Sequence, residues 1–172
     1  MKFKKNNVYL TNIYILFLGI ISSYSLPPFN YWYLNFFTFS LLLIFLTKNH
    51  DDNFKKFFFY GYFFGFGYFV SSLYWIPFSL TYDENFKSLI PLAIILIPGF
   101  ISIFYAFAFI VFKFFLRKRS VFINILIFSL TLGIFEYLRG NILSGFPWNL
   151  FLYSFSENIK FIQIASLVGT YA

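Results

Sequence analysis

Residues 89–116 read LIPLAIILIPGFISIFYAFAFIVFKFFL, and Lys113 is the one charged residue in this stretch. A helix of about 20 mostly apolar residues crosses the ~30 Å hydrocarbon core of a bilayer. This stretch is therefore long enough to span a membrane. Pro91 fits near a helix start, where its missing N–H costs little. Pro98, followed by Gly99, lies deeper and predicts a kink.

The composition of the whole chain agrees with a membrane protein. Hydrophobic residues make up 60% of the 172 residues and charged residues 11%, against ~45–50% and ~25% in typical globular domains. This excludes a soluble enzyme, a disordered tail and a nucleic-acid-binding domain. The net charge of +7 comes from short clusters between apolar runs, which also argues against a nucleic-acid partner. The chain contains no Cys and one His, His50, so we expect neither a metal nor a cofactor.

The same length criterion predicts five complete spans and the start of a sixth. The expected spans cover 8–26, 32–47, 57–80, 89–116 and 121–138, with a partial one over 158–172. We therefore predict an all-α integral membrane protein, with one transmembrane domain over 1–172 and no soluble domain. Ser154 and Glu157 have the spacing of a capping box, which predicts that the last helix begins near them.

The last apolar stretch is too short to cross a bilayer, at about 18 Å if helical. We expect this polypeptide to be a fragment of a longer protein, and the alternative is a shallow, half-inserted terminal helix. Ten of the 13 lysines and arginines fall in loops on one side of the predicted spans. By the positive-inside rule, that side, which includes the N-terminus, is cytoplasmic. The basic N-terminus followed by an apolar run is also weakly similar to a signal peptide.

Two features near the fifth span suggest a functional site on the outer face. Glu136 and Arg139 lie three residues apart and share one helix face. Either they form a structural ion pair, or Arg139 presents its forked guanidinium to a lipid phosphate. The segment Gly145-Phe146-Pro147-Trp148 cannot form a regular helix. It either shapes a groove through which lipid enters or anchors the chain at the interface.

Other Pro-bearing aromatic turns, at 27–29 and 74–77, are predicted on the same face. In the third span, Gly61, Gly65 and Gly67 predict close helix packing.

The segment 136–148, EYLRGNILSGFPW, resembles the E-x-L-R-G-x-x-x-(T/S)-G-F-P-W segment of the apolipoprotein N-acyltransferases. Three further pieces match that family in the same order. They are LPPFNYW at 26–32, the Gly- and Phe-rich stretch 61–75 that ends in Tyr-Trp, and LVGTY at 167–171. On these motifs, which cover nearly the whole chain, the protein is identified as a member of the family.

The resemblance implies an enzyme of the bacterial inner membrane. Such enzymes transfer an acyl chain from a phospholipid donor to the diacylglyceryl-cysteine of an apolipoprotein acceptor, through a thioester on a nitrilase-like domain with a Glu–Lys–Cys triad. Because this chain has no Cys, we assign no catalytic residue and expect it to be inactive without a separate nitrilase-like half. What the resemblance transfers is a lipid-facing outer loop, shaped or supported by Glu136, Arg139, Gly145, Phe146, Pro147 and Trp148.

Two other functions stay open at this point. A small membrane transporter would use helices broken by Pro and Gly, as at Pro98. A noncatalytic membrane scaffold is the second alternative.

Overall fold

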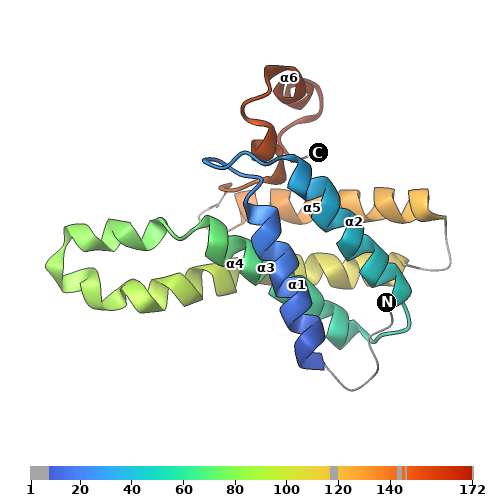
Figure 1. The fold of residues 1–172 in the computed structure, drawn as a ribbon, viewed down its shortest axis with the longest axis horizontal. Coiled ribbons are helices and arrows are strands. Elements are labelled where there is room, and N and C mark those ends of the chain that lie inside the picture. The colour runs from blue at the N-terminus through green and yellow to red at the C-terminus, as the bar shows by residue number, and fades with distance from the viewer. Residues whose placement is uncertain (1–7, 117–119, 143–144, 146, 172) are drawn as a thin grey trace.

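The computed structural model describes residues 8–116, 120–142, 145 and 147–171. Every regular element among these residues is helical, which confirms the all-α prediction. Figure 1 shows the arrangement. The elements are α1 (Val8–Ser23), α2 (Tyr33–Lys48), α3 (Phe54–Ser72), the 3₁₀ helices η1 (Ile76–Tyr82) and η2 (Glu84–Leu89), α4 (Ile90–Phe115), α5 (Val121–Asn141), the 3₁₀ helix η3 (Phe151–Phe155) and α6 (Ile159–Val168).

The helices differ in their capacity to cross a membrane. Glu84–Phe115, with 32 residues, and Val121–Asn141, with 21, are long and apolar enough. α3 and η1 qualify together as a third span bent by 46°. α1 and α2 have 16 residues each, which is about 24 Å of helix. Helix length in the described residues therefore supports two or three spans and does not confirm five.

Two predicted elements differ from the structure. The span expected over 57–80 is split, because α3 ends at Ser72 and η1 begins with Pro77 in its first turn, a position where proline starts a helix but cannot continue one. The capping box is wrong: the Ser154 hydroxyl donates to the Phe151 carbonyl (2.7 Å), and Glu157 accepts from Asn30 (2.5 Å). The helix itself still begins close to the predicted residue 158, because α6 starts at Ile159.

Helix α3 is the centre of the packing and lies against both α1 and α4. Glycines bring these backbones together. A Cβ atom at Gly61 would strike the Tyr105 carbonyl of α4, and one at Gly67 would strike the Leu16 carbonyl of α1. From α1, Gly19 lies as tightly against the backbone of α3. The predicted close packing is confirmed, and no larger side chain fits at these contacts without moving a backbone.

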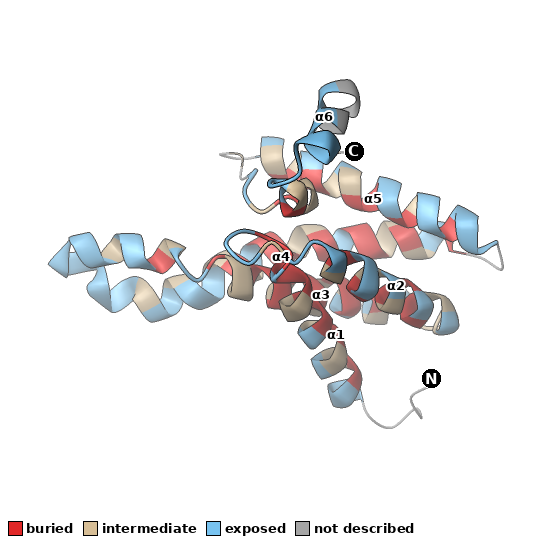
Figure 2. Ribbon diagram, turned by 45° about the horizontal axis from the view of Figure 1, so that its top comes forward, coloured by how far each residue is buried: buried red, intermediate tan, exposed pale blue. Residues whose placement is uncertain are grey.

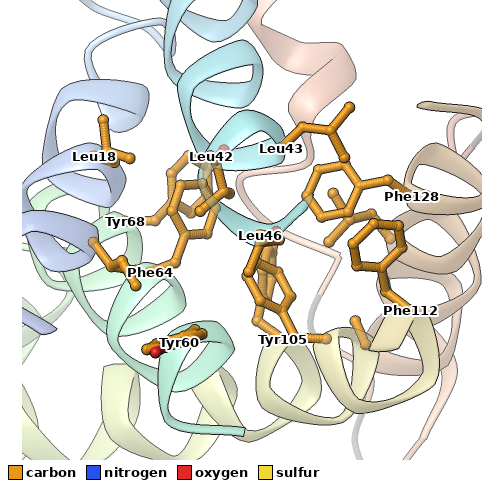
Figure 3. Close-up of a cluster of buried hydrophobic side chains, with 14 of the residues drawn as sticks. Leu18, Leu42, Leu43, Leu46, Tyr60, Phe64, Tyr68, Tyr105, Phe112 and Phe128 are labelled. Atoms are coloured by element: carbon orange, nitrogen blue, oxygen red, sulfur yellow. The ribbon is translucent and has the colours of Figure 1, made fainter. Parts of the chain in front are cut away.

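Aromatic rings fill the interior between the helices (Figure 3). Phe112 of α4 meets Phe128 of α5 with ring centroids 5.1 Å apart, and Phe69 of α3 meets Tyr105 of α4 at 5.2 Å, both edge to face. Such tilted pairs stabilise a core beyond the area that they bury. Figure 2 shows that much of the outside of α5 is exposed, and large apolar residues such as Leu130 lie there. This outside is suited to lipid rather than water.

The glycine contacts make a direct prediction about stability. Gly61→Ala should lower the free energy of unfolding by about 1–3 kcal/mol, since overpacking forces backbones apart. Gly99→Ala is the matched control, because its new Cβ would meet only side-chain atoms, the Tyr62 hydroxyl at 3.2 Å and a Phe66 ring carbon at 3.9 Å. Alanine also favours a helix over glycine by up to about 1 kcal/mol. Thermal unfolding in detergent measures both variants. Equal melting temperatures would contradict this account of the packing.

Candidate functional site

The last turns of α5 place an ion pair inside the protein. Glu136 and Arg139 are 4% and 2% exposed, and Arg139 Nη2 lies 3.6 Å from Glu136 Oε1. The Tyr105 hydroxyl of α4 donates to the same carboxylate oxygen at 2.8 Å. A buried charge is tolerated when it is paired and hydrogen-bonded. The predicted shared helix face is confirmed, and the pair has the surroundings of a structural ion pair. A contact between Arg139 and a lipid phosphate stays a prediction.

Arg139, Glu136 and Tyr68 contact the backbone of the loop 145–151, of which the structure describes residues 145 and 147–151. Arg139 Nη1 donates to the Trp148 carbonyl at 2.7 Å, and the Tyr68 hydroxyl of α3 donates to the Asn149 carbonyl at 3.0 Å. The backbone amide of Phe151 faces the Glu136 carboxylate. The loop thus obtains from side chains the hydrogen bonds that a helix would supply internally.

Two residues in left-handed backbone conformations give the loop its path. Gly145 has φ +67° and Asn149 has φ +56°, a region that glycine adopts freely and asparagine tolerates. A Cβ at Gly145 would lie 2.7 Å from the Gly140 carbonyl. Glycine is therefore required at 145 for both the conformation and the space, and the chain can turn back over the end of α5.

The outward side of the loop is aromatic. Trp148 is 53% exposed, and its ring centroid lies 5.5 Å from that of Trp75. Two of the three predicted turns therefore meet directly. The chain just after the first turn approaches the segment that follows the loop, since the ring centroids of Trp32 and Phe155 lie 6.0 Å apart. That this end of the bundle faces away from the cytoplasm stays a prediction.

Five of the six predicted site residues gather here: Glu136 and Arg139 in the interior, Gly145 at the turn, and Pro147 and Trp148 on the surface. Phe146 lies outside the described residues. Sequence reasoning missed Tyr68 and Tyr105, the two phenols that complete the network. The signal available was chemical, because a phenol buried inside a membrane helix requires a hydrogen-bond partner.

Comparison with known proteins identifies the family. The model of the apolipoprotein N-acyltransferase N-terminal domain matches residues 18–172. The chain belongs to this family. Apolipoprotein N-acyltransferases from Rhodopseudomonas palustris and Rickettsia prowazekii are 35% and 36% identical to it over 158 and 165 residues. These alignments cover 90% and 95% of the chain but 29% and 32% of the relatives, so the chain spans about three tenths of their length.

In this N-terminal domain, the side chains of the candidate site hold the loop 145–151 in place. Among the described residues, no group of three His, Cys, Asp or Glu side chains could hold a metal ion. The carboxylate and the guanidinium are both engaged with each other and with their neighbours. The arrangement therefore fixes an aromatic surface rather than presenting a reactive group.

Burial of the Glu136–Arg139 pair predicts a large loss of stability when Arg139 is replaced, which can be compared with the loss at an exposed ion pair. Arg139→Met should cost about 3–5 kcal/mol of unfolding free energy, because it leaves a buried carboxylate without its charge partner. Adding Glu136→Gln should recover part of that loss, since the two changes act on one interaction. Unfolding monitored by Trp148 fluorescence in a Trp32→Phe, Trp75→Phe background measures both.

Lys87→Met is the matched control for this prediction. Lys87 pairs with Glu84 at the same three-residue spacing, but the pair is exposed, where ion pairs contribute little. An Arg139→Met variant as stable as Lys87→Met would contradict the structural role of Arg139.

Proposed function

We propose that this chain is the membrane part of an enzyme that transfers a fatty acyl chain from a phospholipid to the N-terminal diacylglyceryl-cysteine of a bacterial lipoprotein. Family membership supports the reaction class. The observation that carries the role of this domain is the loop 145–151, whose carbonyls are hydrogen-bonded to Arg139 and Tyr68. In this proposal the loop forms the floor of the entrance through which lipid substrates approach.

The surface of the loop suits that role. The Trp148 and Asn149 carbonyls face buried side chains, and the loop exposes Pro147 and Trp148, with Trp75 beside Trp148. Indole rings favour the boundary between hydrocarbon and headgroups. A fixed surface at this depth would hold a phospholipid and a lipoprotein acceptor near each other, and proximity of that kind contributes strongly to the rate of a two-substrate reaction.

We further propose five crossings of the bacterial inner membrane, with a cytoplasmic N-terminus. The placement of the lysines and arginines supports this orientation. α1 and α2 are short, at about 24 Å each, so these crossings require flanking interfacial residues or local thinning of the bilayer.

No residue of this chain is assigned a catalytic role. The family chemistry implied by the motifs uses a Cys thiolate as nucleophile, and the 172 residues contain no Cys. We therefore propose that the chain by itself is inactive and that a nitrilase-like half supplies the reacting groups.

The functional proposal is tested with a chimera in which this chain replaces the corresponding part of the Rickettsia prowazekii relative. The chimera should transfer a labelled acyl chain from phospholipid to a diacylglyceryl-peptide, whereas the purified 172-residue chain should give neither product nor labelled acyl-enzyme. Arg139→Met in the chimera should lower transfer, because the loop loses its support, and Lys87→Met should not. Equal activity of the two variants at equal membrane levels would contradict the role of the loop.

The orientation makes a separate prediction. A reporter enzyme that works only outside the cytoplasm should be active when it is fused after Asp83. A reporter that works only in the cytoplasm should be active when it is fused after Lys118, because the basic loop stays with the cytoplasmic face. The opposite pattern would contradict the proposed topology.

A further inference from the structure

A helical hairpin extends well beyond the end of α5. It comprises residues 73–98, with η1 as one arm and η2 followed by the first turns of α4 as the other. Figure 1 shows it as the green ribbon at the left, past the point where α5 stops. In Figure 2 most of it is exposed. Its elements pack mainly against one another.

The register between α4 and α5 gives the length of this extension. Tyr105 is hydrogen-bonded to Glu136, and Phe112 packs on Phe128, so the two helices run antiparallel at a fixed offset. α5 ends at Asn141, little more than one turn past Glu136, at the level of about Phe100. The second arm continues from there to Glu84, a distance of about 27 Å at 1.5 Å per α-helical and 2.0 Å per 3₁₀ residue.

The chemistry of the hairpin divides it into a shaft and a tip. The only charged residues in 73–98 are Asp83, Glu84 and Lys87, all at the tip. The shaft exposes large apolar side chains, among them Phe78, Leu92, Ile94, Ile95 and Leu96. Two shaft hydroxyls, of Ser79 and Thr81, donate to the carbonyls of Ile76 and Phe78 within the same helix at 2.8 and 2.6 Å. The shaft therefore offers water little to bind.

The helix lengths distinguish two placements in a bilayer. If α5, at about 31 Å, matched the ~30 Å hydrocarbon core, the hairpin would stand in water with Tyr82 93% and Ile95 59% exposed. Glu84–Phe115 has 32 residues, of which 26 are α-helical and six form a 3₁₀ helix. Its length is about 51 Å and, with a tilt near 30°, matches the ~40–45 Å of a bilayer that includes its headgroup layers. The second placement puts every apolar residue of the shaft in lipid and the charged tip at the headgroups.

We propose that the hairpin 73–98 lies within the leaflet on the side of its tip, and that phospholipid acyl chains fill the step between the hairpin and the end of α5. The proposal rests on the membrane location in the proposed function and deepens it, because it names what covers the loop 145–151. The loop then lies below the membrane surface. Its exposed Trp148, in contact with Trp75 at the base of the hairpin, meets acyl chains rather than water.

Spin labels on single cysteines test the depth of the hairpin, and the absence of native Cys gives a clean background. The variants are Ile95→Cys on the shaft, Asn85→Cys at the tip and, as matched control, Leu130→Cys on the exposed face of α5. All three positions are exposed, so each variant should fold. In phosphatidylcholine nanodiscs, the Ile95 label should match the Leu130 label in its high exposure to oxygen and low exposure to a water-soluble nickel chelate. The Asn85 label should be open to the chelate.

Tryptophan quenching tests the step itself. In the Trp32→Phe variant, the remaining Trp75 and Trp148 should lose emission to lipids brominated along the acyl chain and resist quenching by aqueous acrylamide. Access of the nickel chelate to Ile95 equal to that at Asn85, or quenching of the tryptophans by acrylamide alone, would overturn the proposal. These readouts need no acyl transfer, so an inactive chimera with a lipid-embedded hairpin contradicts only the proposed function.

Discussion

Backbone carbonyls in an apolar environment must be paired, and residues 147–150 belong to no helix that could pair them. Arg139 resolves this because a guanidinium carries five N–H donors in a fixed plane, enough to serve the Trp148 carbonyl while it faces Glu136. A buried guanidinium in turn requires a negative neighbour, which accounts for Glu136, and the carboxylate accepts from Tyr105. Each polar group of the network thus pairs a buried group that would otherwise lack a hydrogen-bond or charge partner.

The reach of this network depends on how closely the helices approach. Tyr68 and Phe69 arrive at the site from α3, and Tyr105 arrives from α4. The two tyrosine hydroxyls and the Phe69 ring reach the ion pair and the loop because Gly61 lets α3 lie directly against the backbone of α4. A larger residue there would separate the two helices and move Tyr105 away from the carboxylate. The glycines of α3 therefore contribute to the site without touching it.

The sequence was sufficient for features that follow from local composition. Apolar runs identified the helices, turn residues located most of their ends, and the three-residue spacing placed Glu136 beside Arg139. Contacts that join distant segments left no such trace. The capping box failed because Glu157 bonds to Asn30 across the fold, and Arg139 bonds to a backbone carbonyl, a partner that no side-chain pattern encodes. Pro77 was visible, but whether it ends a helix or starts a new one depends on packing.

The loop and the unequal helix lengths have a common physical origin. α5 cannot continue past Asn141, because the chain must turn at Gly145 to bring the Trp148 carbonyl within reach of Arg139. Among the described residues, none forms a comparable hydrogen bond to the first turn of α4, and the helical path of this arm continues through η2 to Glu84. The contact between Trp75 and Trp148 lies where the hairpin 73–98 begins to extend beyond the end of α5. A bilayer of one thickness cannot match both α5 and the longer segment Glu84–Phe115. Lipid packing against this domain must therefore change most at the contact between Trp75 and Trp148.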